Sequence, residues 1–118
     1  MAIERFHTGP RMSQAVVHQK TVYLAGQVAS GAVGKSVTEQ TRDILSRIDT
    51  LLHEAKSDKS RMLSATIWLT DMSTFQEMNA VWDSWVTPGA APARATVVSP
   101  QLAAAGFAIE IAVIAAQT

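Results

Sequence analysis

Residues 36–69, SVTEQTRDILSRIDTLLHEAKSDKSRMLSATIWL, decide the fold class, because a helix signal is followed closely by a strand signal. Ser36 and Glu39 fit a capping box, in which the serine hydroxyl accepts a hydrogen bond from the Glu39 N–H and the glutamate side chain reaches back. Apolar residues then recur every three or four positions through residues 37–55 and predict one amphipathic helix. Residues 61–69 alternate as a strand does. The residues of this strand expected to face the helices are Leu63, Ala65, Ile67 and Leu69.

The flanking segments add further strands and a second helix. Gln19–Lys20 is expected to form a hairpin turn, and Gly26 marks a bulge or a close approach to the backbone. An apolar stripe starting at Ser73 or Thr74 predicts a helix that Pro88 ends, because proline cannot continue the hydrogen bonds. The order β-β-β-α-β-α-β-β predicts an α+β fold with both helices on one face of the sheet. The additional strands are expected over residues 3–6, 14–18, 21–28, 94–98 and 107–115.

Composition limits the class of protein. The 118 residues suit a single domain, residues 1–118, with 47% apolar and only 17% charged residues. Ten basic residues balance ten acidic ones, which excludes nucleic-acid or membrane binding through a large basic surface. Cysteine is absent, and we find no signal-like or 18-residue apolar stretch, so a cytoplasmic protein is expected. The apolar content is high for a small monomer.

Two charged residues stand in apolar strands. Arg94 begins the strand 94–98, and Glu110 lies in the middle of FAIEIAVIA, residues 107–115. Both residues fit a structural role, as a rim arginine and a solvated glutamate. They also fit a functional role, because a guanidinium binds a carboxylate bidentately and a carboxylate can handle a water or a proton. Consecutive strands are often neighbours, so we expect the two side chains in one region.

Other candidates give weaker signals. Asn79 interrupts an apolar helix stripe between Phe75 and Trp82, and it is either a solvent-facing amide or a pocket residue. The sequence predicts no metal site, because its histidines are scattered without metal-ligand spacing. These histidines are His7, His18 and His53.

The tryptophans are interpreted as core or interface residues; they are Trp68, Trp82 and Trp85.

The sequence resembles the Rid family, also called YjgF or L-PSP, over nearly its whole length. PARATV (residues 92–97) and the IEI of the last strand are the most specific matches, in this order and near these distances from the end of the sequence. No single motif is sufficient to indicate this resemblance, but the whole set of matching stretches is. The other matching stretches are GPRMSQAV (9–16), VYLAGQVA (22–29), SVTEQT (36–41), ATIWLTDM (65–72), FQEMNAVWDSWV (75–86) and the remainder of FAIEIAVIA.

The resemblance implies a chorismate-mutase-like α+β fold, in which a six-stranded mixed sheet is backed by two helices. It also implies a homotrimer with ligand pockets between subunits. The activity implied is an enamine/imine deaminase of the 2-iminobutanoate/2-iminopropanoate type, which hydrolyses 2-imino acids to 2-oxo acids and ammonia. No metal or organic cofactor is implied.

The resemblance also assigns roles to four residues of this sequence. Arg94 matches the arginine that grips the substrate carboxylate, and Glu110 matches the glutamate near the attacking water. Asn79 matches a helix asparagine close to the pocket, and Gly26 matches a glycine whose backbone borders it. These roles suit a reaction that needs positioning more than covalent chemistry, because a protonated imine is already electrophilic.

Three departures point to a subgroup other than the best-characterised deaminases. Arg11-Met12 stands where that branch has tyrosine, Ala25 where it has serine, and Thr96 where it often has cysteine. Arg11 offers a second contact to an anion, which favours a dicarboxylic or otherwise acidic imino acid. Arg11 and Thr96 are therefore substrate-binding candidates too.

Two alternatives remain open from the sequence. The chain fits a non-catalytic trimer that binds a small carboxylate or acts as a chaperone. It fits less well the RNA cleavage or translation inhibition ascribed to some relatives, because a net charge of zero without a basic stripe disfavours strong RNA binding.

Overall fold

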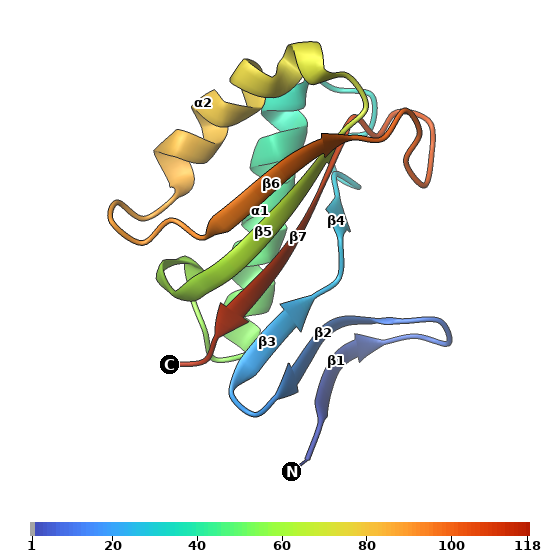
Figure 1. The fold of residues 1–118 in the computed structure, drawn as a ribbon. Coiled ribbons are helices and arrows are strands. Elements are labelled where there is room, and N and C mark those ends of the chain that lie inside the picture. The colour runs from blue at the N-terminus through green and yellow to red at the C-terminus, as the bar shows by residue number, and fades with distance from the viewer. Residues whose placement is uncertain (1) are drawn as a thin grey trace.

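The computed structural model describes residues 2–118 and packs two helices against one face of a mixed sheet (Figure 1). This confirms the predicted α+β order of elements. Two short 3-10 helices, Lys59–Arg61 and Met72–Thr74, precede β5 and α2. In chain order the main elements are β1 (Glu4–Thr8), β2 (Ser13–His18), β3 (Thr21–Leu24), β4 (Gln27–Val28), α1 (Val37–Glu54), β5 (Met62–Leu69), α2 (Phe75–Trp85), β6 (Ala93–Val98) and β7 (Ile109–Ala116).

The sheet runs β1-β2-β3-β7-β5-β6, with β4 also paired to β7, so seven strands fill six positions. The β5–β6 pair is parallel and is joined by α2, whereas the other pairs are antiparallel. The hairpin turn at Gln19–Lys20 is confirmed, with positive φ at both residues, as a two-residue hairpin loop requires.

The expected single strand over residues 21–28 is wrong, because the chain leaves the ladder at Ala25 and Gly26. There the Ala25 N–H donates to the Gln14 carbonyl oxygen at 2.9 Å. The side-chain nitrogen of Gln27, Nε2, donates to the Ala25 carbonyl oxygen at 3.0 Å and to Gln14 Oε1 at 2.9 Å. These bonds stabilise the interruption and hold Gly26 beside β7.

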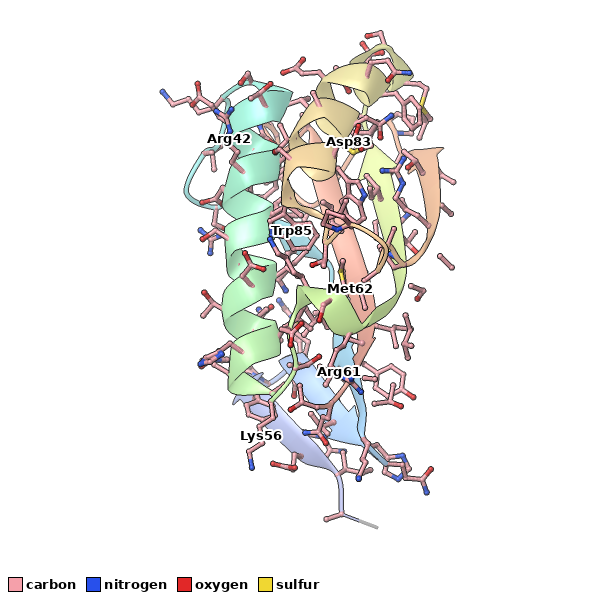
Figure 2. All side chains as sticks on the ribbon, turned by 90° about the vertical axis from the view of Figure 1, so that its left-hand side faces the viewer. Arg42, Lys56, Arg61, Met62, Asp83 and Trp85 are labelled. Atoms are coloured by element: carbon pink, nitrogen blue, oxygen red, sulfur yellow. The ribbon has the colours of Figure 1, made fainter. Side chains whose placement is uncertain are left out.

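The start of α1 follows the sequence signal. Ser36 Oγ accepts a hydrogen bond from the Glu39 N–H at 3.1 Å, which is the first half of the predicted capping box. Thr38 donates to Glu77 Oε2 through its N–H and its hydroxyl, at 2.8 and 2.9 Å, and so ties α1 to α2. Figure 2 shows both helices on the same side of the sheet, with Trp85 between them. Neither helix in residues 2–118 is long and apolar enough to span a bilayer.

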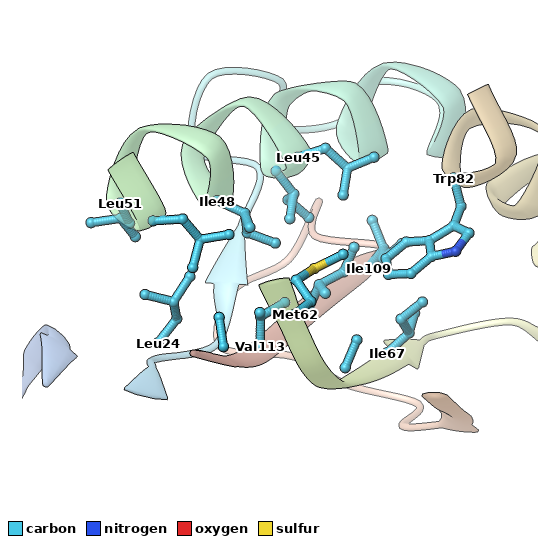
Figure 3. Packing of buried hydrophobic residues seen from close by; sticks show 14 of the residues in the cluster. Leu24, Leu45, Ile48, Leu51, Met62, Ile67, Trp82, Ile109 and Val113 are labelled. Carbon is cyan, nitrogen blue, oxygen red and sulfur yellow. The ribbon is translucent and has the colours of Figure 1, made fainter. Parts of the chain in front are cut away.

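The core lies between the helices and the sheet (Figure 3). Every second residue of β7 is buried, including Ile109, Ile111 and Val113. These side chains pack with fully buried residues of α1, such as Ile48. Burying one such side chain contributes about 1.5–3 kcal/mol, so the core fixes which face of β7 is turned outward.

The predicted facing of Leu63 is wrong. A bulge between Met62 and Ser64 shifts the register of β5 against β7. Met62 is therefore buried, while 52% of the Leu63 surface is exposed. Beyond the bulge, Ala65, Ile67 and Leu69 are buried as predicted. At the other helix, α2 ends at Trp85, before Pro88, and Val86 is already extended.

Gln40 on α1 holds the loop before β7 in place. Its side chain is buried and makes three hydrogen bonds: it donates to the carbonyl oxygens of Lys35 and Gly106 at 3.0 and 2.8 Å and accepts from the Ala108 N–H at 2.9 Å. Each partner is a backbone group, so an apolar side chain at this position would remove all three hydrogen bonds, and of the three partners the Gly106 carbonyl oxygen would still accept from the Gly34 N–H at 3.0 Å.

We predict that Gln40→Met lowers the free energy of unfolding by about 2–4 kcal/mol, because buried polar groups lose their partners while the volume is kept. Urea denaturation followed by circular dichroism measures this change. Gln101→Ala, at an exposed position near the same loop, is the control and should change stability little. Equal stability of the two variants would contradict the role given to Gln40.

Candidate functional site

Arg94 projects from β6 toward α2. It is paired with Ala65 of β5, whose side chain is in the core, so Arg94 is on the helix-facing side of the sheet. Its guanidinium carbon lies 5.3 Å from the centre of the Trp82 ring and 5.8 Å from that of Phe75. Cation–π contacts of this kind hold a guanidinium in place without neutralising its charge. Among the described residues, no carboxylate is within ion-pair distance of Arg94.

Asn79 and Thr96 complete this group. Asn79 Oδ1 accepts a hydrogen bond from Arg94 Nη2 at 2.9 Å, so the asparagine faces the arginine and is only half-buried. Thr96 lies two residues after Arg94 on β6, on the same face. Its Oγ1 is buried and finds no hydrogen-bond partner in residues 2–118. The structure therefore brings three predicted site residues together; we call Arg94, Asn79 and Thr96 the arginine cluster.

Glu110 and Gly26 form a second group, which we call the glutamate pair. Glu110 is half-buried on β7, and burial raises the pKa of its carboxyl group above the ordinary value. A methyl group added at Gly26 would overlap Glu110 Oε2, which confirms the close approach predicted at this glycine. The missing side chain at Gly26 is what lets the carboxylate lie against the backbone.

The arginine cluster and the glutamate pair lie on opposite faces of the sheet, so the expected single region for Arg94 and Glu110 is wrong within one chain. Arg94 is opposite Ala65, and Glu110 is opposite Trp68, three residues further along β5. Residues three apart on a regular strand point to opposite faces. The expectation that the two consecutive strands are neighbours is wrong as well, because β5 lies between β6 and β7 in the sheet.

Arg11 is separate from both groups. It is exposed in the turn between β1 and β2, where the Gly9 N–H donates to the Met12 carbonyl oxygen at 2.8 Å. The β1–β2 hairpin forms one edge of the sheet and β6 forms the other, as Figure 1 shows. Arg11 and Arg94 of one chain are therefore at opposite edges.

A cleft of about 620 Å³ lies between α1 and the β1–β2 hairpin and reaches Gly26, but neither Arg94 nor Glu110 lines it. Charged side chains that line the cleft pair with one another. His7 Nε2 is 3.0 Å from Glu54 Oε1, and Arg47 Nε donates to Asp43 Oδ2 at 2.8 Å. No group of three or more metal-ligating side chains was found within residues 2–118.

Sequence reasoning missed the aromatic contacts of Arg94. Trp82 was interpreted as a packing residue, and its ring is indeed largely buried, but one face also contacts the guanidinium. A signal was present, because Phe75, Asn79 and Trp82 recur at helical spacing and share one face of α2. What the sequence lacked was the position of β6 beside that face.

The comparisons with known proteins agree with this architecture. The family model described as Endoribonuclease L-PSP matches residues 3–117. A RutC family protein of Haemophilus influenzae is 38% identical over 115 residues, covering 98% of each chain. The RutC family protein YoaB of Escherichia coli is 38% identical over 116 residues, covering 98% of this chain and 99% of its own.

Solved structures show the same fold. A YjgF family member from Neisseria meningitidis superposes with a TM-score of 0.95 and 42% identity, covering 100% of this chain and 97% of its own. A protein from Thermotoga maritima described as a putative endoribonuclease superposes with a TM-score of 0.84 and 29% identity, covering 93% and 88%. Since the family model spans almost every residue and the relatives are more than 30% identical over nearly their full length, this chain belongs to the Rid (YjgF/RutC, L-PSP) family.

Proposed function

We propose that this protein is an imine deaminase, which hydrolyses 2-imino acids and their enamine tautomers to 2-oxo acids and ammonia. The observation that carries the proposal is the Arg94 guanidinium, which Asn79 and two aromatic rings hold in place while no carboxylate of the described chain neutralises it. A guanidinium fixed in this way suits the carboxylate of a small acid. Thr96 Oγ1, on the same face of β6, is buried and has no hydrogen-bond partner in residues 2–118, which leaves it able to bond a group that enters beside Arg94.

The chemistry requires only a positioned water and a proton carrier. The Glu110 carboxylate accepts a proton from the water as its oxygen bonds to the iminium carbon, giving a carbinolamine. Glu110 then returns that proton to the nitrogen. The C–N bond breaks, ammonia leaves, and the remaining hydroxyl gives its proton to the Glu110 carboxylate as the 2-oxo acid forms; Glu110 then releases this proton to solvent or to the departing ammonia. A raised pKa suits Glu110 to both steps, because the group must accept and release a proton near neutral pH. No step uses a metal or an organic cofactor.

A complete site needs two copies of the chain in this proposal, because the arginine cluster and the glutamate pair face opposite ways in one copy. We propose a homotrimer in which Arg94 of one subunit meets Glu110 of its neighbour. The outward face of the sheet supports this assembly, since Tyr23 and Val97 are 45% and 43% exposed there. An apolar face of this kind is typical of an interface.

The site suggests a class of substrate and a compartment. The turn that carries Arg11 is close in sequence to Gln14, which bonds Ala25 next to Gly26, so the subunit that supplies Glu110 would also supply Arg11. A second cation favours an imino acid with an additional carboxylate.

The sequence has no cysteine, which suits the reducing cytoplasm, where we place the reaction.

Two other functions are distinguished by the same site. A binding or chaperone-like trimer would use Arg94 without turning its ligand over. The family model is named for an endoribonuclease and the Thermotoga protein is described as a putative one, but this chain has no net charge and presents apolar side chains on its outward sheet face. Phosphate backbones are bound through basic surfaces, so we favour the small acid as ligand.

We predict that Arg94→Lys lowers kcat/KM for imino acid hydrolysis about 100-fold or more, because lysine keeps the charge and loses the bidentate pair. An amino-acid oxidase generates the imine, and a scavenging amine reports what remains. Arg42→Lys, at an exposed position on α1, is the matched control and should retain full activity. Full activity in Arg94→Lys and in Arg94→Ala would overturn the assignment, whereas ligand-induced stabilisation without turnover in the unsubstituted protein would favour a binding function.

Mixing two inactive variants tests the shared site. Arg94→Ala and Glu110→Gln, unfolded and refolded together in equal amounts, should regain about a quarter of the wild-type activity, because one site in four then receives both intact residues. Each variant refolded alone should remain inactive. Sedimentation measures the oligomeric state. Mixed trimers that stay inactive would argue that Arg94 and Glu110 do not share a site.

Gly26→Ala tests the glutamate pair without removing a polar group. The added methyl group must displace the end of the Glu110 side chain, which is flexible, so the fold should survive while activity falls about 10-fold or more. Gly9→Ala is the control, since its nearest neighbour, the Met12 carbonyl oxygen, is 3.9 Å away. Thermal denaturation and kcat/KM are measured together. Unchanged kcat/KM in folded Gly26→Ala would contradict the role of the close approach.

A further inference from the structure

Glu110 lies in the middle of an apolar row that crosses the outward face of the sheet. On one side it is directly paired with Val28 of β4, and on the other with Trp68 of β5. Trp68 is in turn paired with Val97 of β6. Directly opposed residues of neighbouring strands have Cβ atoms about 4.5–5.5 Å apart. Glu110 is thus paired with an apolar residue on each of the two neighbouring strands.

Within one chain, the rows on this face near Glu110 carry no other charge. In the proposed trimer Arg94 of the neighbouring subunit also faces Glu110, and this arginine is the same in every variant compared below. The next row, two residues along β7, consists of Ala112, Thr66 and Ala95. On the sheet strands of this face, the titratable groups outside the row are Tyr23 of β3, His18 of β2 and Arg5 of β1, which lie progressively further from β7. Asp71, just beyond β5, is occupied with the Ser73 N–H at 2.8 Å. Burial is accordingly the cause that raises the pKa of Glu110.

Of the two residues paired directly with Glu110, Trp68 has the larger side chain. On the β4 side the carboxylate lies against the bare backbone of Gly26, where no side chain intervenes. On the β5 side stands an indole, the largest side chain, and it is half-buried although this face of the sheet is largely open. A carboxyl group beside an indole loses water that would stabilise its charged form.

We propose that Trp68 is a positioning residue for Glu110: its indole covers the carboxyl group from the β5 side and thereby sets the affinity of that group for a proton. This inference rests on the proposed function for its consequence, because the deaminase reaction needs Glu110 to take a proton from water and give it to the leaving nitrogen. It does not rest on that function for its test.

Titration of Glu110 by NMR provides the test. In protein labelled with ¹³C at the glutamate carboxyl carbon, the Glu110 signal is identified by its loss in Glu110→Gln. Trp68→Thr, which keeps a strand-favouring residue, should lower the titration midpoint by at least about half a pH unit, because water regains access to the carboxylate. Trp68→Phe, which keeps an aromatic cover, should leave the midpoint near that of the unsubstituted protein.

Controls separate the loss of the indole over the Glu110 carboxyl group from a general disturbance of the sheet. Val97→Thr, one strand further along the same row, should leave the midpoint unchanged. If circular dichroism shows that Trp68→Thr does not fold, Trp68→Leu is used instead, and it too should lower the titration midpoint of Glu110. An unchanged midpoint in a folded Trp68→Thr or Trp68→Leu variant would overturn the proposal.

Kinetics connect the titration to the reaction. The acidic limb of the kcat/KM pH profile should shift in Trp68→Thr by the same amount and in the same direction as the NMR midpoint, and return in Trp68→Phe. A shifted midpoint in a protein without imine hydrolysis would refute the proposed function and leave the role of Trp68 standing. An unshifted midpoint in an active enzyme would refute the role of Trp68 and leave the proposed function standing.

Discussion

β7 is paired on both sides, with β5 along one edge and with β3 and β4 along the other. Its alternate residues fill the core, and the burial of Ile109, Ile111 and Val113 allows only one register, because a slip of one residue would turn them all outward. That constraint places Glu110 on the outward face beside Gly26 and Trp68. The glutamate pair is therefore a consequence of how the core is packed.

The arginine cluster depends on a different constraint, the parallel pairing of β5 and β6 through α2. Because one helix connects the two strands, β6 returns directly beside the α2 face that carries Phe75, Asn79 and Trp82. Arg94 then bonds an amide and contacts two rings instead of a carboxylate. Its orientation is fixed while its charge remains available, a combination that an ion pair would not give.

The sequence was sufficient for what depends on local pattern. Periodicity predicted both helices, the Ser36 cap predicted the start of α1, and the alternation in 61–69 predicted the buried side chains of Ala65, Ile67 and Leu69 on β5. The sequence was insufficient where distant segments decide the result. The bulge at Met62 arises from pairing with β7, and the break at Ala25 and Gly26 arises from bonds to Gln14. The faces of Arg94 and Glu110 likewise depend on registers that no single segment contains.

The central place of β7 also affects how the protein is made. β7 is the last strand in chain order, yet it is the strand that joins β1–β4 to β5–β6. Without β7 the other strands form three groups that are not paired with one another, namely β1–β3, β4 alone and β5–β6. The sheet can therefore close only after β7 has been synthesised, and until then the earlier strands have unpaired edges of the kind that promote aggregation.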